Sequence, residues 1–298
     1  MRNDAFSRKH PAVIFAYFSA VISLCAFFRH PVLTVISFLC AVCYSIYLDL
    51  RGTLKLIVSF CLPVFILTAV INLAFNHRGT VKLAVLPSGN SLTLESIVYG
   101  AFAALMLSAL IIWFSVFSKI FTSDKIVWLA GRAFPTLALM ISMTLRFFPE
   151  FRRRFTAVNA ARNAICLERD KTHPGKGSLK RVFSSFYTVV TWSLENAIVT
   201  SDSMRSRGYG LRGRSAYSPF RFFAADALSL AIIFSFFAAT VAANILGFFE
   251  WHYYPSIGGA LFEPRTFIFY FVFLLLCIFP LLIDGKEAVK WRFLRSEI

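Results

Sequence analysis

Charged residues are scarce in this sequence, and acidic residues are scarcer still. Only 15% of the 298 residues are charged, whereas 58% are hydrophobic, and the mean hydropathy is +0.68. In a soluble domain of this size, about a quarter of all residues are charged. The composition therefore excludes an ordinary soluble domain and indicates a membrane protein. Lys and Arg number 31 against 15 Asp and Glu, and in a membrane protein such an excess usually marks cytoplasmic segments.

The sequence also lacks the residue clusters that commonly perform catalysis or bind metal ions. Its five histidines are scattered, and Cys40 and Cys43 stand inside an apolar run, where free cysteine behaves as a small hydrophobic residue. The segment Gly175-Lys176-Gly177 has neither the upstream glycine nor the following Ser or Thr of a phosphate-binding P-loop. We therefore expect no catalytic site, no metal site, no cofactor and no disulfide framework in this chain.

Long apolar runs are what the sequence has in abundance. A helix needs about 20 apolar residues to cross the hydrocarbon core, with about 17 as the lower limit. Six runs are long enough to span, and they cover residues 12–28, 31–48, 54–75, 97–117, 224–247 and 267–283. Pro63 should kink the third of these runs, because proline removes a hydrogen bond from the helical ladder.

The distribution of positive charge orients these spans. With the N-terminus inside, six spans place both termini and the long segment 118–223 in the cytoplasm. Of the 31 Lys and Arg residues, 25 then fall on these segments, 18 of them within 118–223. Arg51 and Lys55 lie in or beside the short cytoplasmic loop 49–53, which brings the number on the inside to 27. This agrees with the tendency of positive residues to stay inside. We therefore expect a multi-pass protein of the cell membrane with an N-terminal membrane domain over 1–117, a cytoplasmic region over 118–223 and a C-terminal membrane hairpin with its tail over 224–298.

One further apolar stretch, 126–148, is also long enough to span the membrane. It is interrupted by Arg132 and Pro135. A seventh span here would move the basic triplet 152–154 outside, against the charge rule. We favour a helical hairpin in or near the cytoplasmic interface, and a spanning segment remains the alternative.

The cytoplasmic region predicts two amphipathic helices, over about 149–169 and 179–208. A breaker, His173-Pro174-Gly175, lies between them. In each helix the apolar residues recur at intervals that place them on one face. These residues are Phe151, Phe155, Val158 and Ile165 in the first helix, and Phe183, Phe186, Val190, Leu194 and Ala197 in the second.

Both predicted helices end on a similar triplet. The first carries Ala161-Arg162-Asn163 and the second carries Ser206-Arg207-Gly208. Glycine suits a left-handed helix terminus, and asparagine is the next most tolerant residue for that conformation. An arginine at such an end can make paired hydrogen bonds to a carboxylate. A single triplet of this kind is usually a solvated helix end, but two matched copies favour a docking role.

The layout resembles the transmembrane T component of energy-coupling factor transporters, a family that includes the permease subunits of cobalt and nickel uptake systems. Most of the chain takes part in the resemblance, and Asn163 departs from the glycine usual in the first motif. The matching segments are Leu145-Arg146-Phe147-Phe148-Pro149, the two triplets, the wider segment Met204-Arg205-Ser206-Arg207-Gly208-Tyr209-Gly210, and Tyr253-Tyr254-Pro255.

The resemblance implies an all-α polytopic membrane protein of about six transmembrane helices with two long crossed coupling helices in the cytoplasm. A T component joins a small membrane-embedded S component, which chooses a vitamin or transition-metal cargo, to two ATP-binding-cassette ATPases. The motif arginines, here Arg162 and Arg207, would each meet an acidic residue in an ATPase groove. Their neighbours Ala161, Asn163, Ser206 and Gly208 would allow close approach. ATP hydrolysis would belong to the partner subunits.

Other classes of protein remain alternatives. A polytopic membrane enzyme usually needs clustered acidic residues, and the nearest such cluster is Glu168-Arg169-Asp170. A channel or independent secondary transporter usually carries ionisable residues within its spans, and here Asp226 stands near the end of one. Anionic lipid is an expected contact of the basic segment 151–221. Nucleic acid is not needed to explain the positive charge.

Overall fold

The computed structural model describes residues 5–76, 79–85, 91–166, 178–209, 211, 220–259 and 264–296. These residues are mostly helical, and they form two compact units. The first unit combines Met1–Lys125 with Phe220–Ile298, and the second is Ile126–Pro219. The second unit is therefore an insertion between two parts of the first. It covers 126–219, where the sequence predicted a cytoplasmic region over 118–223.

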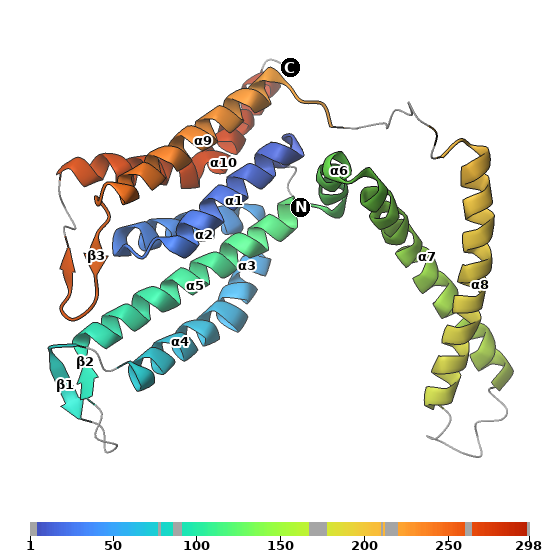
Figure 1. Cartoon of the computed structure of the whole chain (residues 1–298), viewed down its shortest axis with the longest axis horizontal. Helices are drawn as coiled ribbons and strands as arrows, with labels where there is room; N and C mark the ends of the chain where they lie inside the picture. Colours follow the sequence, from blue (N-terminus) through green and yellow to red (C-terminus); the bar gives the residue numbers. More distant parts are fainter. Residues whose placement is uncertain are drawn as a thin grey trace. The chain divides into compact units, whose positions relative to one another are not determined.

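The first unit, the bundle, holds most of the helices (Figure 1). Two short antiparallel hairpins connect some of them: β1 (Lys82–Val85) with β2 (Ser91–Thr93), and β3 (Trp251–His252) with β4 (Gly258–Gly259). A 3-10 turn, Phe6–Arg8, precedes the first helix. The helices are α1 (Pro11–Phe27), α2 (Pro31–Leu48), α3 (Leu50–Leu56), α4 (Leu62–Phe75), α5 (Leu94–Ile120), α9 (Ala224–Ile245) and α10 (Pro264–Ser296).

Five segments of the bundle are helical, apolar and long enough to cross a membrane. The protein is therefore a multi-pass, all-α membrane protein. The first predicted span is a 17-residue apolar helix, α1, which is shorter than the others. The five longer segments are Pro31–Leu48, Leu50–Phe75, Leu94–Ile120, Ala224–Ile245 and Pro264–Trp291.

The chain near Pro63 shows how the third predicted run accommodates its proline. A π-helical turn, Ile57–Cys61, separates α3 from α4, and Pro63 stands at the start of α4. A π-helical turn widens the backbone, and insertions of this kind are a recognised cause of irregularity in long helices. The irregularity in this run is therefore a π-helical turn that ends two residues before Pro63.

Aromatic side chains fill the centre of the bundle. Tyr17 and Trp113 are fully buried, and their ring centroids lie 6.2 Å apart. The Tyr17 hydroxyl donates to the backbone oxygen of Cys277 at 3.0 Å, and Trp113 Nε1 donates to Ser37 Oγ at 3.0 Å. These two buried polar atoms therefore each have a partner on another helix, as a low-dielectric interior favours. These bonds connect α1 to α10 and α5 to α2.

The second unit, the inserted unit, contains α6 from Ile126 onward together with α7 (Pro135–Cys166) and α8 (Ser178–Ser206); α6 itself begins at Ser123. Helices α7 and α8 pack on each other and cross (Figure 1). Phe134 separates α6 from α7, so the predicted break beside Pro135 is confirmed. Helices α6 and α7 lie close together at this bend. A Cβ added at Gly131 would stand only 3.3 Å from Ala138 Cβ.

The predicted start of the first amphipathic helix is wrong. That helix was expected to begin near Pro149, yet α7 begins at Pro135 and continues through Pro149 to Cys166. The second arm of the predicted hairpin and the amphipathic helix are therefore one helix of 32 residues. A proline inside a helix removes one amide hydrogen bond, but its fixed φ remains close to the helical value. The strong helix formers on both sides outweigh that loss here.

Candidate docking site on the inserted unit

The C-terminus of α8 forms a left-handed helix ending. Gly208 has a φ of +75°, and its amide donates to the Arg205 oxygen at 3.0 Å. The amide of Tyr209 donates to the Met204 oxygen at 3.1 Å. These two bonds define a Schellman motif, in which glycine avoids the strain that a Cβ would impose. The left-handed terminus predicted at Gly208 is confirmed.

This ending leaves Arg207 exposed at the end of the last helical turn. Its guanidinium forms no ion pair with any residue that the structure describes. Ser206, on the same turn, is also exposed, and its hydroxyl donates to the Ser203 oxygen at 2.9 Å. Arg207 is thus free to bind a carboxylate on another molecule, while the Schellman motif fixes the direction in which the chain leaves the helix.

The first triplet has a different geometry. Asn163 is helical, because no described residue other than glycine has a positive φ, and α7 continues for three residues beyond it. The predicted left-handed terminus at Asn163 is therefore wrong. A residue with a Cβ loses roughly 1–2 kcal/mol in that conformation, and the following residues extend the helix instead. Ala161 and Asn163 are both exposed on this helical segment.

Arg162 lies at the crossing of the two long helices. Its guanidinium donates to Thr188 Oγ1 on α8 at 2.9 Å, and its side chain is partly buried. The hydroxyl of Thr188 in turn donates to the Ser184 oxygen at 3.0 Å. Arg162 and Arg207 are therefore not equivalent: Arg162 bonds to the neighbouring helix, whereas Arg207 makes no such bond to a residue that the structure describes.

Further contacts hold the crossing together. The guanidinium of Arg154 lies 3.3 Å from the centroid of the Trp192 ring, and the same guanidinium lies 3.4 Å from Glu150. Phe151 and Phe186 meet edge to face at 6.4 Å. A cation over an indole ring is attracted by the ring quadrupole, by about 0.5–1 kcal/mol at an exposed site. In the described part of the inserted unit, the crossing thus depends on a few side chains, and the buried residues Ala138, Ser185 and Val189 form no extended apolar core.

Much of the remaining surface of α7 and α8 is apolar and exposed. Exposed apolar side chains in such numbers indicate a surface that lipid or another protein covers. The stripe predicted on the second helix is largely exposed, at Phe183, Phe186 and Leu194. In the stripe predicted on the first helix, only Ile165 is exposed, whereas Phe151, Phe155 and Val158 are half-buried. The exposed side chains include Leu137, Met140, Leu145 and Phe148 on α7, and Phe183, Tyr187, Leu194 and Ile198 on α8.

The two junctions of the inserted unit with the bundle are held by the N-terminal segment. At the first junction, buried Lys125 donates to the backbone oxygens of Ser7 at 2.7 Å and Ile120 at 2.8 Å. Its burial also lowers the pKa of the ammonium below its ordinary value. The neighbouring residue Phe6 donates its amide to Asp284 Oδ1 on α10 at 2.8 Å. The start of the chain thus connects α6 and α10.

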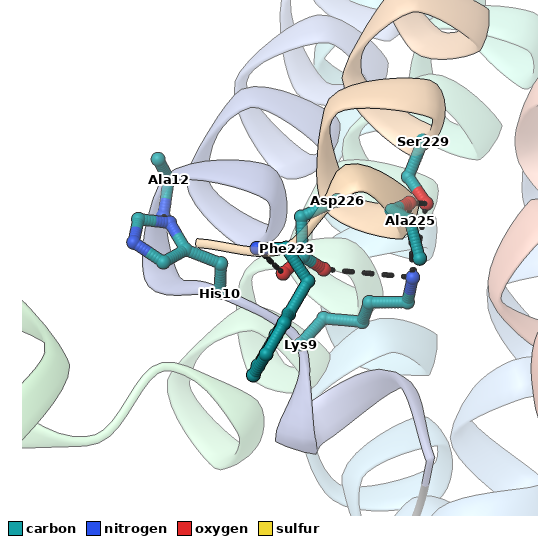
Figure 2. Close-up of polar contacts among 7 residues, drawn as sticks. All are labelled: Lys9, His10, Ala12, Phe223, Ala225, Asp226 and Ser229. Atoms are coloured by element: carbon teal, nitrogen blue, oxygen red, sulfur yellow. Dashed lines mark hydrogen bonds and ion pairs between the residues drawn. The ribbon is translucent and has the colours of Figure 1, made fainter. Parts of the chain in front are cut away.

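The second junction, at the start of α9, contacts the same segment (Figure 2). Lys9 Nζ lies 3.5 Å from Asp226 Oδ1 and donates to Ser229 Oγ at 3.1 Å. The other carboxylate oxygen of Asp226 accepts from the Phe223 amide at 3.3 Å and caps the helix. The His10 ring meets Phe222 edge to face at 5.0 Å. Residues 5–10 therefore contact the bundle both where the chain leaves it, at Lys125, and where it returns, at the start of α9.

Sequence reasoning missed this arrangement. From the sequence, Asp226 is only an ionisable residue near the end of an apolar run, and nothing in the pattern gives Lys9 a role beyond its positive charge. Their separation of 217 positions offers no local pattern that predicts a contact. The one usable indication was Asp226 itself, because an acid in the first turn of a helix commonly caps it.

Within the described residues, no group of three or more His, Cys, Asp or Glu side chains is placed to hold a metal ion. Comparisons with known proteins supply no family either, because no family model and no curated protein matches the chain.

Proposed function

We propose that this chain is the transmembrane scaffold and coupling subunit of an importer of the energy-coupling factor type. In this proposal α1 supplies a sixth span, both termini lie in the cytoplasm, and the protein resides in the cell membrane. Two ATP-binding-cassette ATPases bind the inserted unit from below, and a small S component binds the cargo, a vitamin or a transition-metal ion. The chain itself catalyses nothing.

The observation that carries the proposal is the pair of crossed helices inserted between Lys125 and Phe220. One of them ends on the exposed Arg207, and both present uncovered apolar surface. A basic helix end suits an acidic groove, and the apolar surface suits a second membrane protein. Two binding surfaces of opposite character on one helical pair are what a subunit needs if it transmits motion between two partners.

The two arginines would engage the ATPases differently. Arg207 can bind a carboxylate directly, since no described residue holds it by an ion pair. Arg162 would exchange its hydrogen bond to Thr188 for a bond to the second ATPase, and that exchange would alter the crossing of α7 and α8. Closure of the ATPase pair on ATP would then move the two helix ends, and the apolar faces would convey the motion to the S component.

The contacts of residues 5–10 give this movement a fixed base. Coupling requires that the ends of a moving segment stay attached to the membrane bundle. Lys125 and Asp226 attach the two junctions to one N-terminal segment, through Ser7 and Lys9 respectively. The moving part would thus be the crossed pair, and the bundle would serve as the scaffold.

The proposal is tested by Arg162→Ala combined with Arg207→Ala in cells that depend on uptake of the cargo. The double variant is expected to reach the membrane at normal levels but to lose uptake and to bind the ATPases weakly. Lys286→Ala with Lys290→Ala is a matched control, because it removes the same charge from exposed positions on α10. Normal uptake by the arginine double variant would overturn the coupling role.

A further inference from the structure

Helix α7 changes chemical character part-way along its length. Its first 14 residues, 135–148, include one charged residue, Arg146, and would extend about 21 Å. Large apolar side chains are exposed on several sides of this half, including Leu137 at 53% exposure, Leu139 at 40% and Leu145 at 45%. A helix that is apolar on many sides is stable only inside hydrocarbon or a large apolar interface. The half that follows Pro149 is basic and polar.

Two exposed arginines lie just after this change in character. Arg152 and Arg153 are exposed, and neither forms an ion pair with any residue in the described parts of the chain. The next residue, Arg154, is held by Glu150 and Trp192. The neighbouring side chains therefore divide α7 into a face engaged with α8 and a face available to another molecule.

The available face carries a shallow depression of about 600 Å³, which is open to the outside and is called the groove below. Apolar and basic groups line the same groove, and its residues are Phe148, Pro149, Arg152, Arg153, Thr156, Ala157 and Ala160. None of these is acidic, and the one carboxylate of α7, Glu150, already pairs with Arg154. The groove thus offers two guanidinium groups beside an aromatic ring at the boundary between an apolar and a polar half-helix.

We propose that this groove binds an anionic phospholipid of the cytoplasmic leaflet, with the phosphodiester on Arg152 and Arg153 and an acyl chain along Phe148. Guanidinium groups match the geometry of phosphate oxygens through paired hydrogen bonds. A phospholipid carries hydrocarbon and phosphate in one molecule. Its acyl chain would lie along the apolar half of α7, and its phosphate would lie at the start of the basic half. An acidic soluble protein would satisfy the arginines but would leave residues 135–148 in water.

This inference depends on the membrane location of the protein and is independent of the proposed ATPase partners. Positively charged residues near a membrane surface gain about fivefold in binding each from anionic lipid. Loss of both arginines is therefore expected to weaken binding by roughly 30-fold. A zwitterionic lipid should gain much less from the same side chains.

The test uses the full-length protein in detergent, titrated with short-chain phosphatidylglycerol or phosphatidylcholine and followed by native mass spectrometry. Arg152→Gln with Arg153→Gln should bind phosphatidylglycerol roughly 30-fold more weakly and should leave phosphatidylcholine binding unchanged. The control Lys286→Gln with Lys290→Gln should keep the original affinity, and circular dichroism should show equal helix content in all three proteins.

Four results would overturn the proposal. The arginine double variant could keep its affinity for phosphatidylglycerol, or the lysine control could lose as much, which would indicate general electrostatic attraction. Inorganic phosphate at millimolar concentration could displace the lipid, which would make the groove a site for free anions. The variant could instead keep the lipid and lose the ATPases, which would assign the groove to protein docking. A failure of ATPase docking through Arg162 and Arg207 alone would leave the lipid site intact.

Discussion

The bundle and the inserted unit solve the burial of apolar surface in different ways. In the bundle, aromatic rings such as Tyr17, Phe18 and Trp113 are fully buried and contact one another. In the inserted unit, the described buried residues are Ala138, Ser185 and Val189, all of them small or medium in size. The bundle therefore has a core of its own, whereas α7 and α8 form a pair whose apolar surface needs a partner.

This difference shows where stability and function reside. A buried aromatic cluster gives a rigid scaffold, since tightly packed side chains tolerate little displacement. The contacts described at the crossing are a cation-π contact, a bond from Arg162 and an aromatic pair, and contacts of this kind can be rearranged at small cost. The contrast agrees with a scaffold that remains fixed while the inserted pair responds to its partners.

The largest effect expected from this comparison concerns Trp113. Its replacement by Ala removes a fully buried ring and the hydrogen bond to Ser37, and should lower the free energy of unfolding by about 3–5 kcal/mol. Phe183→Ala on α8, where the ring is exposed, should change it by less than about 0.5 kcal/mol. Thermal denaturation in detergent measures both. Equal losses would contradict the difference between the two units.

The next effect concerns the second junction. Asp226→Ala removes the carboxylate beside Lys9 and the cap on the Phe223 amide, and should destabilise the protein by about 2 kcal/mol. Exchange of the pair, Lys9→Asp with Asp226→Lys, should recover part of the loss. Protease cleavage near Phe222 should become faster in the single variant and slow again in the exchanged one. Unchanged cleavage in the single variant would show that the pair does not hold the junction.

A smaller effect is expected at the crossing of α7 and α8. In a double-mutant cycle, Arg154→Gln and Trp192→Leu should show a coupling of about 0.5–1 kcal/mol, because the guanidinium stacks on the indole. Disulfide formation between cysteines introduced at Phe151 and Phe186 reports the crossing directly. It should slow when either partner of the cation-π contact is absent. If the effects of the two substitutions are strictly additive, the contact does not stabilise the crossing.

A further effect appears only below neutral pH and involves His30, in the loop between α1 and α2. Burial lowers the pKa of His30 from 6.5 to about 4, so the imidazole is neutral in the folded protein at neutral pH. As the pH falls below 6.5, the unfolded chain takes up this proton first, and the folded state loses stability between pH 6.5 and 4. His30→Gln should flatten this part of the profile of melting temperature against pH. A profile identical to that of the original protein would exclude His30 as its source.

The sequence predicts those parts of the structure that follow from local pattern. Apolar runs locate the spans, because a membrane helix must satisfy its own backbone. Phe134-Pro135 locates the bend before α7, and Gly208 locates the left-handed end of α8. In each case a residue type imposes a conformation that neighbouring residues do not alter.

Other features escape prediction because context decides them. Pro149 and Asn163 both suggest a helix boundary, yet both lie within α7, where the flanking helix formers outweigh their preferences. The docking residues illustrate the same limit. Two similar triplets predict two similar helix ends, but Arg162 reaches Thr188 because α8 crosses α7 at that point. The pairing of Lys9 with Asp226 likewise depends on how α1 and α9 pack.

The central claim is that this chain couples ATPases to a substrate-binding membrane protein, and purification from native membranes tests it most directly. The tagged full-length protein is solubilised gently, and the proteins that remain bound are identified by mass spectrometry. We predict two ATP-binding-cassette subunits and a small hydrophobic protein, with the ATPases lost when Arg162 and Arg207 are both replaced by Ala. A chain that purifies alone and shows transport or enzymatic activity by itself would contradict the claim.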